Sequence, residues 1–330
     1  MPPAALAPIF AVYKYALAPV GPLAWLGASI SALDLAAAFR LAVVLRQLRE
    51  AFLQEYTSST SATANGDHGQ RARPSVESRA RTRDFATTLV MVYGGEAVVA
   101  PWLGIQPSFL LSGSIPALYL GAQVLVDFLP SVPFPSIHNE APLAVLDAFT
   151  RATLLCNIVP TVVTNHVSSV VSSSPWTLLV TALIMANGGP LFTNALSLLH
   201  PTPIGLTTPP ELLPYGWTAT DLWVAPVVTG LYATLTHAQP FFALLHELLY
   251  TVLSPVGLAS FNGHKELQPV DPDTARAVCV LVLGSLFVTR TVKTFGGASI
   301  WSTPGRTVGG TVAQKSMVNG SGGAKKTKTQ

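Results

Sequence analysis

Long, uninterrupted apolar runs dominate the hydrophobic pattern of the chain. No Asp, Glu, Lys or Arg occurs between Arg151 and Glu211, and apolar runs of about 18 or more residues are typical of membrane-spanning helices. Helices are expected rather than barrel strands, because these runs are continuously apolar and do not alternate with polar residues. The pattern predicts seven spans, at about 23–45, 85–103, 115–129, 143–164, 175–199, 222–242 and 275–295.

Composition supports an integral membrane protein. The chain is 49% hydrophobic and 11% charged, whereas an average soluble domain carries about 25% charged residues. A net charge of +3, placed at the periphery, gives no reason to expect nucleic acid as a partner. Cys156 and Cys279 both lie in apolar runs and are predicted to be buried thiols rather than a disulfide or a metal site.

Three segments fall outside the predicted membrane domain or interrupt it. Residues 1–22 form an N-terminal segment without a cleavable signal, because Lys14 follows the first apolar stretch. Residues 56–78 are rich in Ser, Thr, Gly and Asn and predict a flexible loop. Residues 296–330 are rich in Gly, Ser, Thr and Lys, lack Asp and Glu, and predict a disordered basic tail. The membrane domain is therefore expected at 23–295.

Positive charge predicts the orientation. The loop from Arg46 to Asp84 holds seven basic residues, and the region from Arg290 to the end holds seven more, together 14 of 19. The positive-inside rule places both on the cytosolic side. The first loop and the C-terminus lie on the same side only if an even number of spans separates them. Six predicted spans follow the first loop, so this condition is met. The N-terminus is then lumenal or external, and the C-terminus is cytosolic.

The order of short motifs predicts an internal duplication. Three motifs of the first half recur in the same order in the second: 32–40 with 145–151, Gly94-Gly95 with Gly188-Gly189, and Leu118-Tyr119 with Leu231-Tyr232. Each half then holds three spans, and because three is odd the second half inserts upside down. The sequence thus predicts a 3+3 inverted repeat plus a seventh helix, an arrangement that favours a substrate or ion path at the repeat interface.

The paired glycines are candidate path residues. Each glycine inside a helix costs about 1 kcal/mol relative to Ala, so Gly94, Gly95, Gly188 and Gly189 need a reason. One interpretation is a kink that exposes backbone carbonyls to an ion; the other is close packing of two helices. Asn187 and Asn194 flank the second pair, where they either line a hydrophilic path or bond neighbouring helices.

Intramembrane charges form the second group of candidates. A charge at the bilayer centre costs at least about 2.5 kcal/mol, so such residues are expected to face water or a partner. Asp147 and Arg151 are spaced to pair on one helix face. His237 in the sixth predicted span is either a titrating or gating group or a hydrogen-bonded one. The candidate charges are Asp34, Glu96, Asp147 and Arg151, with Arg40 and Asp127 nearer the interfaces.

At this point the chain resembles the trimeric intracellular cation channels of the endoplasmic reticulum. The resemblance is carried, in order, by Leu33-Asp34, 92–96 with 103–107, Asp147-Ala-Phe-Thr-Arg151, 186–194, Thr236-His237 and 287–291. It implies a seven-helix inverted repeat with an ion path in each protomer and a homotrimer in the endoplasmic reticulum or nuclear envelope membrane. It also implies potassium conduction as a counter-ion to calcium release, without a cofactor.

One motif departs from that family. The family has Lys-Glu-Val followed by Arg in the fourth span, where it binds a phosphoinositide headgroup. Here Asp147 and Ala148 stand at the lysine and glutamate positions, and only Arg151 matches. Replacing a cation by an anion weakens binding of a multiply charged phosphate, so lipid regulation through Arg151 is not expected from this motif.

Two other classes of function remain open from the residues alone. A lipid-modifying or cyclising membrane enzyme would use Asp34, Glu96 and Asp147 as acid and base groups. A secondary transporter would use the same inverted repeat. No Gly-rich phosphate loop, metal-ligand spacing or nucleophile elbow occurs in the sequence. The prediction is therefore a cation channel and not an enzyme.

Overall fold

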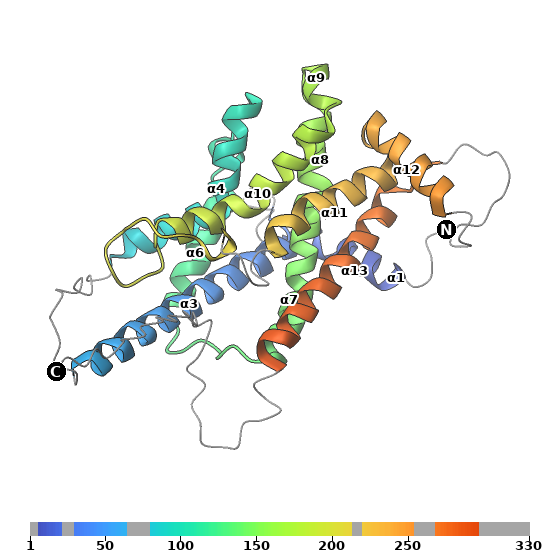
Figure 1. The fold of residues 1–330 in the computed structure, drawn as a ribbon. Helices are drawn as coiled ribbons and strands as arrows, with labels where there is room; N and C mark the ends of the chain where they lie inside the picture. The colour runs from blue at the N-terminus through green and yellow to red at the C-terminus, as the bar shows by residue number, and fades with distance from the viewer. Residues whose placement is uncertain (1–5, 22–29, 65–79, 213–219, 254–267, 297–330) are drawn as a thin grey trace, which may run out of the picture.

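The computed structural model describes residues 6–21, 30–64, 80–212, 220–253 and 268–296. The regular elements in these ranges are helices, joined by turns and loops, together with an isolated bridge between Pro19 and Ser31 (Figure 1). The α-helices are α1 (Ala7–Ala16), α3 (Ala32–Ala64), α4 (Arg81–Leu103), α5 (Ser108–Leu111), α6 (Ser114–Phe128), α7 (Ile137–Thr153), α8 (Val159–Thr164), α9 (Ser169–Ser172), α10 (Pro175–Ala195), α11 (Thr220–Thr236), α12 (Pro240–Leu253) and α13 (Pro272–Thr291).

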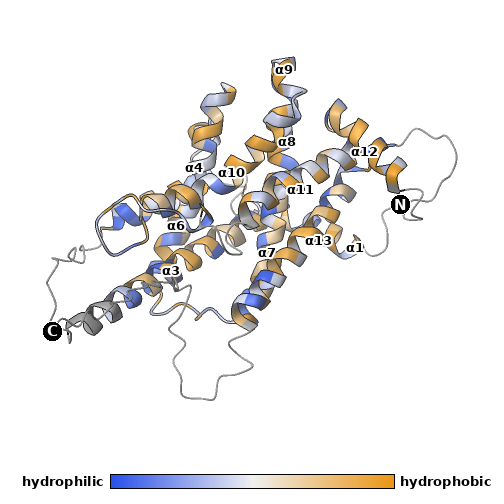
Figure 2. Cartoon of the chain, viewed as in Figure 1, coloured by the Kyte–Doolittle hydropathy of each residue, from blue (hydrophilic) through white to orange (hydrophobic). Residues whose placement is uncertain are grey.

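Four helical segments of the described chain are long and apolar enough to cross a membrane: Arg81–Leu103, Ile137–Thr164, Pro175–Ala195 and Pro272–Phe295. Three shorter apolar helices accompany them, at Ser114–Phe128, Leu222–Thr236 and Pro240–Val252. Figure 2 shows that apolar residues prevail along α11, α12 and α13. These helices are consistent with a multi-pass membrane protein, and the all-α prediction is confirmed for the described residues.

The first predicted span differs from the structure. Instead of ending near residue 45, α3 runs 33 residues to Ala64. It is absent from the four membrane-crossing candidates, since residues 32–50 carry two acidic and three basic side chains. The loop predicted at 56–78 is wrong for residues 56–64, where Thr57 and Ser58 bond back to carbonyls of the preceding turn. Residues 65–78 and the predicted tail from 297 lie outside the described residues.

The sixth predicted span, 222–242, is broken in two. Helix α11 ends at Thr236, and His237 adopts a left-handed backbone with φ of 54°. Helix α12 then begins at Pro240, whose ring fixes φ and lacks the N–H that a continuous helix would need.

The fourth predicted span is continuous from Ile137 to Thr164, but it contains a π-helical turn at Leu154–Ile158. Pro160 follows this turn directly. A proline inside a helix removes one backbone hydrogen bond and crowds the carbonyl four residues earlier, and a π turn provides the extra room. Cys156 lies within the turn.

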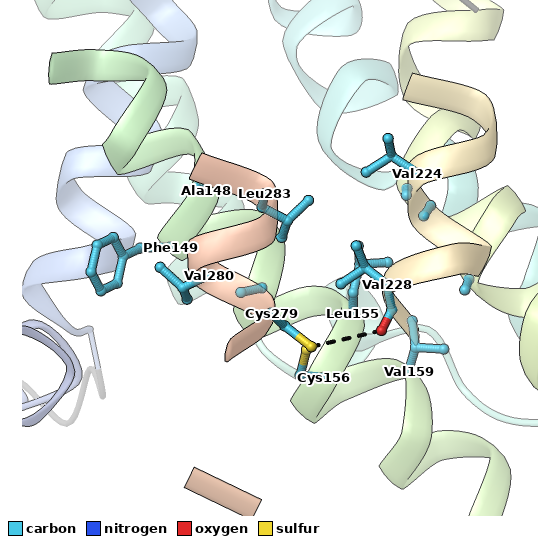
Figure 3. Packing of buried hydrophobic residues seen from close by; sticks show 14 of the residues in the cluster. Ala148, Phe149, Leu155, Cys156, Val159, Val224, Val228, Cys279, Val280 and Leu283 are labelled. Carbon is cyan, nitrogen blue, oxygen red and sulfur yellow. Dashed lines mark hydrogen bonds between the residues drawn. The ribbon is translucent and has the colours of Figure 1, made fainter. Parts of the chain in front are cut away.

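The largest apolar core joins α7, α10, α11 and α13. Leu155 and Val228 are fully buried in it, and Cys156 and Cys279 are 1% and 0% exposed (Figure 3). Both cysteines are free, which confirms the prediction of buried thiols.

Helix α1 was not predicted, and it packs onto this core. Its Tyr13 is 5% exposed and donates a hydrogen bond from its hydroxyl to the carbonyl of Phe149 (3.1 Å). The guanidinium of Arg276 lies 4.7 Å from the Tyr13 ring centroid. The N-terminal segment is thus tied to α7 and α13 by a buried aromatic anchor.

Candidate functional site

The two glycine pairs meet each other where α4 crosses α10. A Cβ placed on Gly94 would lie 3.0 Å from the Cα of Gly189, and one on Gly188 would lie 2.6 Å from the Cα of Gly95. A Cβ on Gly189 would overlap the carbonyl oxygen of Met91. The two backbones are therefore in direct contact, and only glycine fits at this crossing.

Helices α4 and α10 each continue as an α-helix through their glycine pair. In α10, Pro190 follows the pair directly and lacks the N–H that would bond the Ala186 carbonyl, so a kink there stays a prediction. The alternative interpretation, close helix packing, describes the contact. A role for Gly94, Gly95, Gly188 and Gly189 in an ion path stays a prediction.

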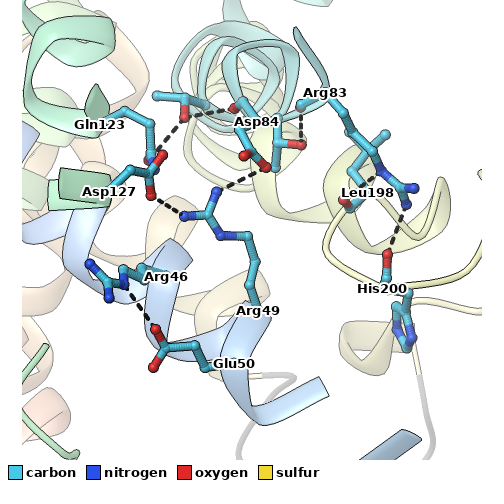
Figure 4. Close-up of polar contacts among 11 residues, drawn as sticks. Arg46, Arg49, Glu50, Arg83, Asp84, Gln123, Asp127, Leu198 and His200 are labelled. Atoms are coloured by element: carbon cyan, nitrogen blue, oxygen red, sulfur yellow. Dashed lines mark hydrogen bonds and ion pairs between the residues drawn. The ribbon is translucent and has the colours of Figure 1, made fainter. Parts of the chain in front are cut away.

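One side of the crossing holds a buried ionic cluster between α3, α4 and α6 (Figure 4). Arg49 of α3 contacts Asp84 of α4 at 3.0 Å and Asp127 of α6 at 2.7 Å. The Arg49 side chain is 5% exposed, and that of Asp127 is 36% exposed. A buried arginine held by two carboxylates joins the three helices.

Next to this ionic cluster lie polar side chains with unused hydrogen-bonding capacity. Thr88 donates to the carbonyl of Asp84 at 3.0 Å and lies 3.3 Å from the amide oxygen of Gln123. Gln123 is 0% exposed, and its Nε2 has no partner; neither has the hydroxyl of Thr193, which is also fully buried. Such groups are normally satisfied by protein or ordered water, so this region has the polarity to hold water or an ion.

The other side of the crossing gathers polar groups of α3, α4 and α6. The hydroxyl of Tyr93 is buried without a partner, and the Tyr93 ring packs on Phe109, with centroids 5.1 Å apart. Tyr119, Glu96 and Asp34 are its electrostatic neighbours. Polar side chains thus flank the glycine crossing at both ends. We call these polar residues the polar column. Its members are Asp34, Tyr93, Glu96, Tyr119, Thr88, Gln123, Thr193, Arg49, Asp84 and Asp127.

Two predicted carboxylates of the column each cap the start of a helix. Asp34 lies in the first turn of α3, where it accepts from the backbone and hydroxyl of Ser31 while Ser31 accepts from the Asp34 backbone. This reciprocal arrangement is a capping box. Glu96 accepts from the backbone and hydroxyl of Ser108 (2.5 and 2.8 Å) at the start of α5.

The predicted Asp147–Arg151 pair is not formed as expected. Asp147 lies 3.4 Å from Arg40 of α3, which also holds Glu140 of α7 at 2.6 Å. Arg151 donates to the carbonyl of Ala186 in α10 at 2.5 Å. These charges therefore link α7 to α3 and α10, and Asp34, Glu96 and Asp147 do not converge on one site.

The two asparagines differ in role. Asn187 is 5% exposed, and its amide donates to the carbonyl of Leu183 within α10 at 2.8 Å. Asn194 donates to Glu211 at 2.8 Å and ties the end of α10 to the 3-10 turn Pro210–Leu212. Neither bonds a neighbouring membrane-crossing candidate through these contacts.

Two arginines beside the column donate hydrogen bonds to carbonyls at the C-terminal ends of α10 and α6. Arg83 donates to four carbonyls that follow α10, those of Ser197, Leu198, His200 and Thr202, at 3.0–3.2 Å. Arg46 donates likewise to Val126 and Leu129 at the end of α6. Such contacts satisfy carbonyls that a helix terminus leaves free. Burial lowers the pKa of His200 below its usual range; Glu55 opposes this shift and Arg83 reinforces it.

Sequence reasoning missed several members of the column. Gln123 and Thr193 are not charged, so a search for intramembrane charge passes over them. A polar residue inside the apolar run 115–129 was nevertheless a usable signal for Gln123. The partnership of Arg49 with Asp84 and Asp127 depends on how three helices pack and leaves no mark in local spacing.

No protein-family model, curated protein or solved structure matches the chain.

Proposed function

We propose that the chain is a monovalent cation channel, conducting potassium through a path inside each protomer along the polar column. The observation that carries the proposal is the set of fully buried polar groups without partners, Gln123 Nε2 and Thr193 Oγ1, beside the α4–α10 crossing. In a membrane, buried polar groups of this kind mark water-filled or ion-binding interiors.

The reciprocal glycine contacts support the proposed 3+3 inverted repeat. Gly94 meets Gly189 and Gly95 meets Gly188, as expected when two matched helices cross at a pseudo-twofold axis. In inverted-repeat proteins the path lies at the interface between the halves. The polar column lies beside the contact between α4 and α10, the second helix of each proposed half.

The chemistry of the column suits cations. Hydroxyl, amide and carboxylate oxygens can replace part of the hydration shell of an alkali ion. Asp34 and Glu96 place negative charge at one end of the column, and the carboxylate of Asp127 is partly exposed at the other. Acidic mouths raise the local concentration of cations and exclude anions.

Reconstituted flux tests the proposal. Purified protein in potassium-loaded liposomes should carry electrogenic potassium flux without a gradient of a second solute. Thr193→Val removes a hydroxyl that has no protein partner, so folding should be retained while flux per folded molecule falls several-fold. The matched control is Thr229→Val: Thr229 is equally buried, but its hydroxyl donates to Leu155 at 3.1 Å.

In the control, about 1 kcal/mol of stability should be lost with flux per folded molecule unchanged. Equal flux in Thr193→Val and wild type would remove the polar column from the path. Flux that requires a second solute gradient would instead identify a secondary transporter. The enzyme alternative has less support, because Asp34, Glu96 and Asp147 are bonded to three separate partners.

The wider proposal follows the resemblance to trimeric intracellular cation channels. It comprises a homotrimer in the endoplasmic reticulum or nuclear envelope, a lumenal N-terminus, a cytosolic C-terminus and a counter-ion role in calcium release. Arg151 is engaged with the Ala186 carbonyl, and Asp147 adds an anion beside it. We therefore do not extend the family's phosphoinositide site to this chain.

A further inference from the structure

Helices α11 and α12 meet at a break that we call the elbow (Figure 1). Contacts of several side chains hold α12 in place there. At its corner, Gln239 is 2% exposed, and its amide donates to the carbonyls of Ser172 and Ser174 at 2.7 and 3.2 Å. Phe242 is 2% exposed, and its ring packs over Gly230 of α11. These contacts fix the first turn of α12, and none of them titrates near neutral pH.

The second attachment lies farther along α12 and is a pair of imidazoles. His237 Nε2 lies 2.8 Å from His246 Nδ1, and the rings meet edge to face with centroids 5.0 Å apart. His237 holds its ring there from a left-handed backbone, φ 54°, which is uncommon for a residue other than glycine. The elbow therefore keeps an unfavourable backbone conformation in which the two rings bond.

Protonation limits this bond. A neutral imidazole has one N–H donor and one acceptor nitrogen, so one facing nitrogen donates and the other accepts. A first added proton can go to the outer nitrogen of the donor ring and leave the bond intact. A second must go to the accepting nitrogen, which places two N–H groups and two positive charges face to face. The pair therefore bonds only while it carries at most one positive charge.

We propose that the His237–His246 pair is a pH-operated latch that holds the outer part of α12 against α11 and releases it on acidification. The Gln239 and Phe242 contacts and the packing of Leu245 against the apolar core remain and act as the hinge, so release affects the turns of α12 beyond His246. The outward side of α12 carries exposed Leu244, Leu248 and Val252, so release repositions an apolar surface. The latch is independent of whether the protein conducts ions.

Few charged groups lie near the pair on the described helices and turns. Burial and the His237 ring lower the pKa of His246, and Glu247 opposes the shift. Between Leu222 and Thr236, α11 carries no charged residue, and the Ser172–Ser174 turn carries none. Asp271, near the Val270 backbone that bonds Leu235, accepts from Thr274 at the start of α13. The bond is therefore lost once acidification puts a second proton on the pair.

Distance measurement between two spin labels tests the latch in the full-length protein in lipid nanodiscs. Labels at Leu248→Cys on outer α12 and Ser173→Cys, in the turn that holds Gln239, report the elbow; Cys156 and Cys279 are buried and should not label. At about pH 7.5 we expect one short-distance population. At about pH 5 a second, longer population should appear.

Variants distinguish the latch from a general effect of acid. His246→Gln and His237→Asn remove one titrating ring each, and asparagine tolerates the left-handed backbone, so both should lose the pH response. His138→Gln changes an exposed histidine on α7 and should keep it. The proposal is overturned if wild type shows the same distances at both pH values, or if the response persists in either variant. Should one variant fail to fold, the other decides.

Discussion

Glycine at the α4–α10 crossing is required by space, because an added Cβ would meet backbone atoms of the other helix. Gly95 would place a Cβ against the carbonyls of Ile184 and Met185, and Gly189 would place one against Met91. These are backbone atoms, which cannot move aside as the end of a flexible side chain can. The cost of glycine in a helix, about 1 kcal/mol each, is offset by the close approach of two membrane helices.

Gly189→Ala should therefore destabilise the protein. The added methyl must push α10 away from α4, and overpacking of this kind costs about 1–3 kcal/mol or more. The matched control is Gly121→Ala on α6, where a Cβ meets nothing within 4 Å and helix propensity improves by up to about 1 kcal/mol. Thermal unfolding in detergent should show a lower Tm for the first and an equal or higher Tm for the second. Equal Tm values in Gly189→Ala and wild type would contradict the packing interpretation.

At residue scale the sequence located the glycine pairs and the charges, but not what each does. Asp34 is the clearest case. It was placed within a span that began at residue 23, yet Ser31-Ala-Leu-Asp34 matches the capping-box spacing, which predicts a helix start. The partners of Asp147 and Arg151 lie on α3 and α10, so helix spacing alone pointed to a pair that the packing does not form.

At the scale of helices, Arg49 joins three elements that share little apolar contact. Helices α3 and α6 bury a small cluster around Ala38, Ala42, Ala122 and Val126, whereas the large core lies among α7, α10, α11 and α13. The first half of the chain therefore depends more on ionic and capping contacts, from Arg46 and Arg49, than the second half does.

Arg49→Ala should loosen this first half. The substitution leaves the carboxylates of Asp84 and Asp127 without their shared cation, and breaking a buried pair costs about 3–5 kcal/mol. Glu50→Gln is the control, because its pair with Arg46 is exposed on one side and worth less than about 1 kcal/mol. Chemical denaturation in detergent, with limited proteolysis of α3, should separate the two variants. Equal sensitivity would show that the Arg49 cluster does not hold the helices together.

Element boundaries were predictable where apolar runs ended at a strong local signal. The second span ends at Gly104, which takes a left-handed C-cap with φ of 64°, and the fifth begins at the Ser174 cap. The sixth span failed because Ala238, Phe241 and Phe242 continue the apolar run past the turn at His237. Hydropathy does not register a backbone reversal inside an apolar run, although Pro240 was a signal for it.

For the whole molecule, assembly follows only from the family resemblance. If the chain is a homotrimer, low-concentration cross-linking of detergent-solubilised protein should stop at three copies. The physical reason is that closed cyclic assemblies leave no free interface for a fourth copy. A strictly monomeric protein that still conducts would remove the trimer while leaving the channel proposal in place; larger ladders would also contradict the trimer.

The number of times the chain crosses the membrane is the remaining question for the whole molecule. Two numbers of membrane crossings can be tested. Four segments have the length and apolarity to cross a membrane, while the sequence pattern and the charge bias favour seven. The counts differ at α3, α6 and α11; the 15 residues of α6 are short for a bilayer core of about 30 Å. Cysteines substituted at exposed positions between the candidate spans distinguish the two counts, since the native cysteines are buried.

We expect Thr57→Cys and Ser131→Cys to react with an impermeant maleimide on one side of sealed vesicles, and Ser112→Cys and Ser173→Cys on the other. Seven crossings require this, because α4, α6 and the α7–α8 segment would each reverse the side. If only the four long segments cross, Ser112 and Ser131 would share a side, and Thr57 would share the other with Ser173. Labelling before and after permeabilisation distinguishes the two patterns. The second pattern would exclude the 3+3 inverted repeat, because the first half would then cross the membrane only once between Thr57 and Ser131.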